Sequence, residues 1–192
     1  MKVLIAIAGV LVALGLLLVG PYNSLVRMDE EVKQAWAQVE NVYQRRLDLI
    51  PNLVETVKGY AAHERETFTQ VTEARAKAAG SIHVDAPSDP QKFAQFQESQ
   101  AALSNALSRL MVVVEKYPEL KANENFLSLQ TQLEGTENRI AVERGRFNEK
   151  AQTFNTRLRQ FPINFVGNLF GFKLKEYFKA DAAAKTAPKV QF

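Results

Sequence analysis

Residues 45–54 read RRLDLIPNLV, and this stretch decides how the long helical pattern around it is interpreted. Its apolar residues recur at helical spacing, yet Pro51 stands among them without a backbone N–H to donate. Inside a helix, Pro51 leaves the carbonyl of Leu47 without its usual hydrogen bond, so the helix must kink or end here. Only Asp48 and Asn52 nearby favour turns, which makes a kinked, continuous helix the better prediction than a fold-back.

An apolar stripe with steps of three and four residues runs in both directions from this proline. Its members are Val32, Trp36, Val39, Tyr43, Leu47, Ile50, Val54, Val57, Ala61, Phe68 and Val71. The stripe predicts one helix from about Ser24 to Ala79, because Gly80 is a usual residue at a helix C-terminus.

Two further stripes predict helices over about 90–117 and 126–161, which Pro118 and Pro162 close. Asp89 before a proline is typical of a helix start. No strand-like alternation is present, so the sequence predicts an all-α fold. We expect an elongated antiparallel bundle of three long helices, or four if the chain folds back at the central proline, followed by a short helical and aromatic C-terminal segment.

Residues 3–20, VLIAIAGVLVALGLLLVG, carry no charged side chain. As a helix they span about 27 Å, close to a ~30 Å hydrocarbon core. A cleaved signal peptide needs a shorter apolar run and an A-x-A-like site, which the following GPYNS lacks. We therefore predict a transmembrane signal-anchor over residues 1–21. Lys2 favours a cytoplasmic N-terminus, and Tyr22, followed by Asn23, would lie at the membrane interface.

The predicted helices differ in length. If straight, the first would be about 84 Å long, against about 42 Å and about 57 Å for the others. The membrane-proximal half of the first helix, with Trp36 and Tyr43, then finds no partner within the chain. Either the helix folds back at Pro51, or this half packs on other copies, and the sequence favours self-association.

Composition excludes several classes of site. The chain has 24 Lys and Arg interleaved with 21 Asp and Glu and a net charge of +3, so no basic stripe for nucleic acid is present. It has no cysteine and two histidines. HERET (63–67) lacks the second histidine of a zinc-protease motif, and Tyr60 stands where Glu-x-x-His needs its glutamate. With no nucleophile elbow or phosphate loop either, the sequence predicts no catalytic site, metal or cofactor.

Four charged residues fall on the apolar faces of the predicted helices: Arg46, Glu64, Glu137 and Arg144. A buried, unpaired charge is costly, so we expect ion pairs between helices, with the two arginines meeting Glu64 or Glu137. The alternative is that these long side chains extend to the rim of the bundle and stay in water.

Residues 161–180, FPINFVGNLFGFKLKEYFKA, interleave aromatic residues, among them Phe165, Phe170 and Phe172, with lysines. Exposed, they would form an element that binds the membrane interface or a partner. We favour the alternative that they cap the open end of the bundle, because the last helix of an up-down-up bundle ends away from the anchor. Residues 181–192 are predicted to be a flexible tail.

The blocks YNSLV (22–26), AWAQVENVYQRRLDLIPNLVETVKGYAAHE (35–64), YPELKANENFLSLQ (117–130) and TENRIAVERGRFN (136–148) resemble the LemA family. The later FP at 161–162 and GF at 171–172 fit the same pattern. The resemblance implies a single-pass bacterial membrane protein with a helical bundle that is not known as an enzyme. It also implies a poorly defined role near envelope stress, membrane proteases and membrane organisation.

The sequence thus predicts an anchor over residues 1–21, a bundle over 22–180 and the tail 181–192. We expect a non-enzymatic scaffold or adaptor in the bacterial cytoplasmic (inner) membrane, with its bulk in the periplasm or exterior. Its expected partners are the lipid bilayer, further copies of itself and other envelope proteins such as membrane proteases. The alternative is an oligomer that organises or remodels lipid through the anchors and the aromatic segment.

Overall fold

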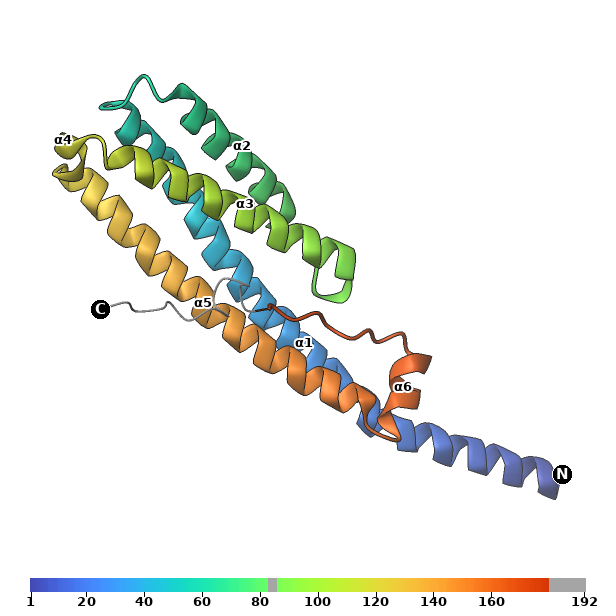
Figure 1. Cartoon of the computed structure of the whole chain (residues 1–192). Helices are drawn as coiled ribbons and strands as arrows, with labels where there is room; N and C mark the ends of the chain where they lie inside the picture. Colours follow the sequence, from blue (N-terminus) through green and yellow to red (C-terminus); the bar gives the residue numbers. More distant parts are fainter. Residues whose placement is uncertain (83–85, 180–192) are drawn as a thin grey trace, which may run out of the picture.

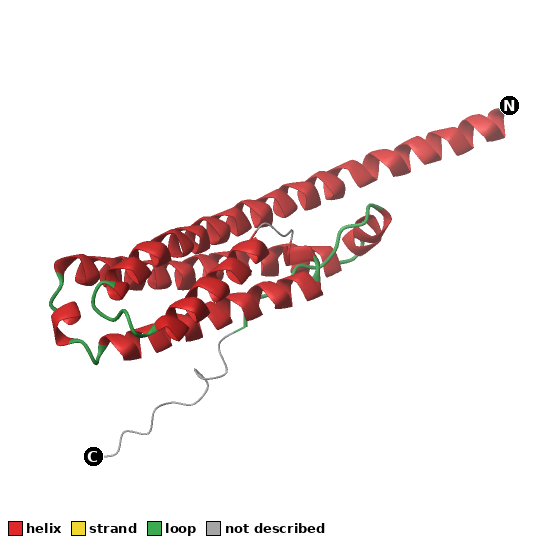
Figure 2. Ribbon diagram, turned by 90° about the horizontal axis from the view of Figure 1, so that it is seen from above, coloured by secondary structure: helices red, strands yellow, loops and turns green. Residues whose placement is uncertain are grey.

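The apolar stripe around Pro51 forms the inner face of α1 (Lys2–Lys58), the longest helix in the computed structural model of this chain (Figure 1). The structure describes residues 1–82 and 86–179, without the side chains at positions 6, 8, 10–14, 16, 17 and 86. The first part of α1 projects beyond all the other helices, and the rest is the spine of the bundle (Figures 1 and 2).

The other elements are shorter and are joined by brief connections. They are α2 (Arg65–Ile82), the 3₁₀ turn η1 (Ala86–Ser88), α3 (Pro90–Val114), α4 (Pro118–Lys121), α5 (Glu124–Arg159) and α6 (Ile163–Leu169). The described residues contain no strand, which agrees with the predicted all-α class. Asp89 caps α3 as predicted, since its carboxylate accepts hydrogen bonds from the backbone N–H groups of Gln91 and Lys92.

The chain turns back on itself at residues 59–64, between α1 and α2. The turn begins at Gly59, a poor helix former, and its backbone closes with a bond from the Glu64 N–H to the Ala61 carbonyl at 3.0 Å. Tyr60 joins the turn to the connection between α4 and α5, because its hydroxyl accepts from Asn123 Nδ2 across 3.0 Å.

The prediction of one helix reaching Ala79 is therefore wrong. The second half of that predicted helix is α2, which runs antiparallel to α1 and continues past Gly80 to Ile82 (Figure 1). The apolar stripe did not reveal the turn, because Ala61 within it and Phe68 after it are buried at spacings that a helix also gives.

Pro51 does not end α1, and it lies exposed on the helix surface. The carbonyl that it leaves free belongs to Leu47. Arg75 of α2 fills the gap, because its Nε donates to the Leu47 carbonyl oxygen across 2.9 Å. Pro51 therefore does not reverse the chain. It helps α1 to pack against α2, which begins after the chain reverses eight residues later.

Four long helices make up the bundle, where the sequence favoured three. α1 packs along α5 and α2 packs along α3. With an even number of long helices, α5 returns to the end from which α1 projects, and α6 packs there against both α1 and α5 (Figure 1). The aromatic segment after α5 therefore lies beside the projecting part of α1, and the prediction that it caps the far end is wrong.

The N-terminal residues 2–20 belong to α1. Among the residues that the structure describes, no helix has an apolar stretch long enough to cross a membrane. The predicted flexible tail, residues 181–192, lies outside the described residues.

Candidate functional site

Arg46 lies inside the bundle with 2% of its surface exposed. Its Nη1 donates to Glu137 Oε1 across 2.8 Å and to Ser104 Oγ across 3.1 Å. Its Nη2 donates to the side-chain oxygen of Gln100, and its guanidinium carbon lies 5.1 Å from the centre of the Tyr43 ring. One charge on α1 thus joins α3 and α5, and the predicted pairing of Arg46 with Glu137 is present.

A cleft of about 260 Å³ opens beside this cluster, and Arg46, Glu137 and Arg144 are among the residues that line it. Its polar groups can hold another polar group, but they include no histidine. Ser104 Oγ donates to the Gln100 carbonyl across 3.2 Å rather than to a base, so the activated nucleophile of a hydrolase is not formed here. The cluster is best described as a polar connection between helices.

The other two charged residues of the predicted set have different partners. Arg144 Nη2 donates to the Lys179 carbonyl across 3.0 Å, and its guanidinium carbon lies 4.7 Å from the centre of the Phe178 ring. Glu64 is the last residue of the turn at the far end of the bundle, where its carboxylate lies 3.7 Å from Lys116 Nζ. The fold-back separates Glu64 from both arginines, and Arg144 faces the C-terminal segment.

Trp36 and Tyr43 are buried within the chain, with 6% and 4% of their surfaces exposed. The Trp36 ring has four phenylalanine rings with centroids 5.2–6.0 Å away: Phe93, Phe96, Phe147 and Phe178. Its indole N–H is satisfied by Glu40 Oε1 at 3.0 Å. The expectation that this half of the first helix lacks an intrachain partner is wrong, because α3, α5 and the C-terminal segment cover it.

Residues 173–179, called the C-terminal strap below, run in extended form back along the bundle from α6 (Figure 1). Asn155 of α5 pairs with both backbone groups of Lys175, donating to its carbonyl and accepting from its N–H at 2.8 Å each. Asn148, two turns earlier, pairs in the same way with Phe178 at 2.9 Å each. The strap therefore runs antiparallel to α5.

Lys175 is 8% exposed and its Nζ lies 2.7 Å from Asp29 Oδ1 of α1. It also donates to Ser88 Oγ of η1 across 2.8 Å. Burial raises the pKa of Asp29, but hydrogen bonds from Lys175 and Lys33, and their charges, outweigh that effect and hold this pKa below its ordinary value.

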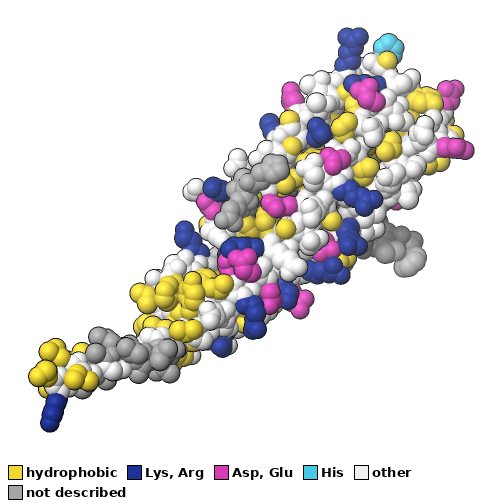
Figure 3. Space-filling view, turned by 180° about the vertical axis from the view of Figure 1, so that it is seen from behind, with side chains coloured by type: hydrophobic (Ala, Val, Ile, Leu, Met, Phe, Trp, Pro, Cys, Tyr) yellow, Lys and Arg dark blue, Asp and Glu magenta, His cyan; other side chains and the backbone are white. Residues whose placement is uncertain are grey.

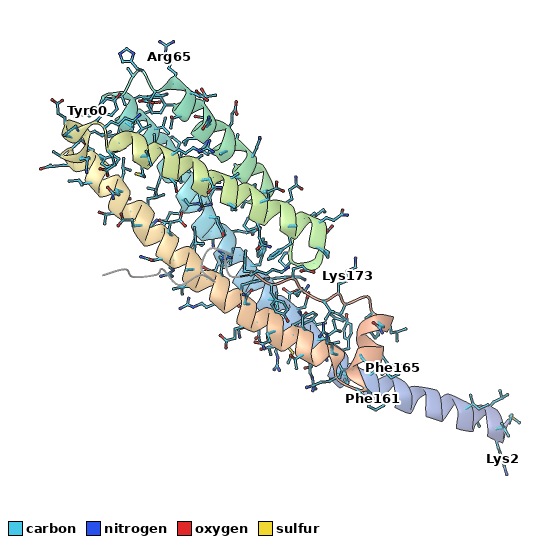
Figure 4. The ribbon with its side chains drawn as sticks, in the orientation of Figure 1. Lys2, Tyr60, Arg65, Phe161, Phe165 and Lys173 are labelled. Atoms are coloured by element: carbon cyan, nitrogen blue, oxygen red, sulfur yellow. The ribbon has the colours of Figure 1, made fainter. Side chains whose placement is uncertain are left out.

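The aromatic residues after α5 meet α1 where its projecting part begins. The Tyr22 ring lies 4.7 Å from the Phe170 ring and 6.0 Å from the Phe172 ring, centre to centre. Phe165 is 65% exposed, and Figure 4 shows it beside the point where α1 leaves the bundle. Asn23 lies exposed on α1 next to this group.

Sequence reasoning found Arg46 and Glu137 but missed the residues that hold the strap. A signal was present, because the dipeptide Phe-Asn recurs at 147–148 and 154–155. Seven residues are nearly two helical turns, so each phenylalanine and each asparagine repeats on one face. Within the described residues, no three His, Asp or Glu side chains gather as metal ligands would.

Residues 35–192 match the LemA family. The chain is 30% identical over 182 residues to magnetosome protein MamQ 1 of Paramagnetospirillum magneticum, a match that covers 86% of this chain and 67% of that protein. It is 29% identical to magnetosome protein MamQ of Magnetospirillum gryphiswaldense over the same shares. It is 28% identical to protein LemA of Metamycoplasma hominis over 148 residues, 77% of this chain and 64% of that one. The chain therefore belongs to the LemA family.

Proposed function

We propose that this protein is a non-enzymatic scaffold or adaptor anchored in the bacterial cytoplasmic membrane by residues 1–21. Its N-terminus lies in the cytoplasm and its bundle on the other side. One observation carries the proposal: the uncharged residues 3–20 of α1 and the exposed aromatic residues of the α6 region lie at the same end of the bundle (Figures 1 and 4).

The exposed apolar side chains around α6 are here called the aromatic collar. They are Phe161 (80% exposed), Phe165 (65%), Leu169 (70%) and Phe170 (52%). Hydrophobic side chains gather where the projecting helix leaves the bundle (Figure 3). Tyr22 contacts the collar only two residues beyond the uncharged stretch, or about 3 Å along a helix. Exposed phenylalanine and leucine side chains favour the boundary between lipid headgroups and acyl chains, so the collar would insert at that boundary.

The non-enzymatic part of the proposal has independent support. The cleft beside Arg46 lacks an activated nucleophile, and the described residues bring together no set of metal ligands. The relatives are named for LemA and for the magnetosome, and neither name is that of an enzyme. As a scaffold, the protein would gather copies of itself or other envelope proteins, such as membrane proteases, at the membrane surface.

Tryptophan quenching tests the membrane position of the collar. The full chain is placed in vesicles whose lipids carry bromine high in the acyl chains, as Phe165→Trp or as Val112→Trp, an equally exposed position on α3. Native Trp36 is buried in both variants and serves as a common background. We expect strong quenching of the added tryptophan at position 165 only. Equal quenching at both positions, or none at either, would contradict the proposal.

Topology is accessible because the chain has no cysteine of its own. A single cysteine replacing exposed Gln132 on α5 should react with a membrane-impermeant maleimide added outside intact spheroplasts. Labelling only after lysis would place the bundle in the cytoplasm, and release of the protein by alkaline carbonate would remove the anchor.

A second candidate is an oligomer that organises or remodels lipid, and the exposed collar favours it. Vesicles containing the full chain should then change shape, and Phe161→Ser with Phe165→Ser should abolish the change. Remodelling that survives both substitutions would leave the collar without this role.

A further inference from the structure

The strap lies in a groove formed by α1, α3 and α5. Phe178 is 6% exposed, and its ring is within 6.3 Å of the rings of Trp36, Phe93, Phe96 and Phe147, centre to centre. These four rings come from the three helices. The groove therefore ends in an aromatic box that one phenylalanine fills.

Two asparagines of α5 hydrogen-bond the backbone of the strap, and each binds one strap residue. Asn148 and Asn155 are seven residues apart, which is about 10.5 Å along a helix. Their partners, Phe178 and Lys175, are three residues apart, which is about 10 Å along an extended chain. The two spacings match, so the two asparagines of α5 can bind an extended backbone. These hydrogen bonds do not depend on the side chains of the bound segment.

Two side chains of the strap add sequence selectivity. Lys175 reaches the carboxylate of Asp29 at 2.7 Å, in a site where that carboxylate is 14% exposed. Phe178 fills the aromatic box three residues later. An extended peptide with a lysine followed, three residues on, by a phenylalanine would make both contacts.

Every hydrogen bond described for the strap joins it to another element. Besides α5, the carbonyl of Pro87 accepts from the Glu176 N–H at 2.8 Å, and Ser88 accepts from Lys175. The strap is joined to α6 by residues 170–172, which include Gly171 at φ +73°. The strap therefore binds the groove as a peptide ligand would, and the same segment of another copy could make the same contacts.

We propose that this groove is a binding site for an extended Lys-x-x-Phe peptide, and that it accepts the strap of a neighbouring copy in exchange for its own. The proposal rests on the anchoring and self-association proposed above and supplies a mechanism for them. Copies anchored in one membrane hold their grooves at equal height. A strap rising from the membrane end of one copy then meets the neighbour's groove in register.

The exchange depends on local concentration. A short connection gives the intrachain strap an effective concentration on the order of millimolar, so isolated copies keep their own strap. When two copies exchange straps, each lost contact is replaced by an identical contact with the other copy. Exchange therefore costs little free energy and occurs where copies are crowded. Because residues 170–172 span only about 10 Å when extended, the exchanging copies must touch.

Half-cysteine copies test the exchange. Arg144→Cys is placed in one tagged copy and Lys179→Cys in a second copy. The native Arg144 side chain spans the gap between α5 and the strap, with its Nη2 3.0 Å from the Lys179 carbonyl, so a bifunctional maleimide of similar length can join the two cysteines. The two copies are produced together and treated with this reagent in native membranes. We expect a mixed cross-linked dimer at least ten times more abundant than with Val112→Cys, an exposed α3 position, in place of Arg144→Cys. Adding Phe178→Ala to the second copy should reduce that dimer at least tenfold.

One chain carrying both cysteines is the positive control and should form an internal cross-link through the same reagent. If it does so while the half-cysteine copies link no more than the Val112 control, the exchange is overturned. A lysine-reactive cross-linker separates the two proposals: dimers with that reagent but not through the cysteines leave self-association standing without exchange. Monomers with both reagents overturn both.

A peptide measurement does not depend on the geometry of the cross-link. Labelled KLKEYFK, residues 173–179, is titrated into the detergent-solubilised full chain carrying Lys175→Ala and Phe178→Ala, whose own strap lacks both anchors. We expect at least tenfold tighter binding than to the unaltered chain. The same peptide with Phe178→Ala should bind at least tenfold more weakly than the intact peptide. Equal binding of the two peptides would overturn the selectivity of the groove.

Discussion

Arg75 donates from its Nε to the carbonyl oxygen of Leu47 across 2.9 Å, and this is the carbonyl that Pro51 leaves without a partner in α1. A proline within a helix removes the hydrogen bond to the fourth residue before it. Here the free acceptor lies on the side that α2 covers, and an arginine of α2 uses it. Pro51 therefore converts a bond within one helix into a bond between two.

This relationship predicts an energetic coupling between Pro51 and Arg75. Arg75→Met should lower the free energy of unfolding by about 1 kcal/mol, because it leaves the Leu47 carbonyl unsatisfied. In a Pro51→Ala background, the restored N–H satisfies that carbonyl, and the same substitution should cost less than half as much. Urea unfolding of the four proteins in detergent, followed by helical circular dichroism, measures the coupling.

Arg109→Met is the matched control. Arg109 of α3 donates to Gln70 of α2 across 3.1 Å at the surface, and no proline is involved. Its cost should be the same in the unaltered chain and in the Pro51→Ala background. A coupling as large for Arg109 as for Arg75 would show that the alanine acts on the α2 packing as a whole.

The helix boundaries show where sequence patterns stop being informative. The stripe of α1 and α2 predicted which residues are buried, since Val39, Val57 and Val71 are all at most 1% exposed. It could not show the turn between them, because a tight reversal preserves the three-and-four spacing. The decisive residue was Gly59 rather than Pro51, and the number of long helices, and hence the place of the aromatic segment, depended on it.

The polar contacts divide in a similar way. Arg46 was predictable because a charge on an apolar face needs a partner inside the bundle. The partners of Asn148 and Asn155 are backbone groups of the strap. Almost every residue carries the same backbone groups, so the sequence could not indicate which of them would pair. The pair Asp29–Lys175 joins two distant segments, so only the folded chain brings it together.

Glu137→Gln should lower the free energy of unfolding by about 1 kcal/mol. The glutamine can still accept from Arg46, but the buried guanidinium loses its counter-charge. The cost is modest because the Glu137 side chain is 44% exposed and water screens part of the interaction. Glu134→Gln, one turn earlier on the exposed face of α5, should change stability by less than about 0.5 kcal/mol, as is usual for surface positions. Equal effects in urea unfolding would show that Glu137 contributes only as a surface residue.

Lys175→Met should destabilise the chain by about 1–2 kcal/mol, because it leaves Asp29 in a mostly buried site with Lys33 as its remaining charged partner. Methionine is similar in length and apolar, so the loss reports the ammonium group, which also donates to Ser88 Oγ and lies 5.2 Å from the centre of the Phe154 ring. Lys173→Met removes the same charge from an exposed position of the strap and should have little effect. Thermal unfolding of the three proteins checks the difference, and equal shifts for the two lysines would contradict it.

The contribution of the Asp29–Lys175 pair should depend on pH in one direction only. The pKa of Asp29 is lowered in the folded chain, so folding favours its charged form. The stabilisation is fully present above the unfolded pKa, about 3.9, and is lost as the pH falls through the lower folded pKa. Lys175 and Lys33 are the charged groups that face Asp29. The stability difference between the unaltered chain and Lys175→Met should therefore be constant from pH 7 to about 5 and shrink below about 4.

The other carboxylates are present in both proteins, so their contributions cancel in this difference. A difference that stays constant down to about pH 2.5, or grows there, would show that Lys175 stabilises the strap through contacts other than its bond to Asp29.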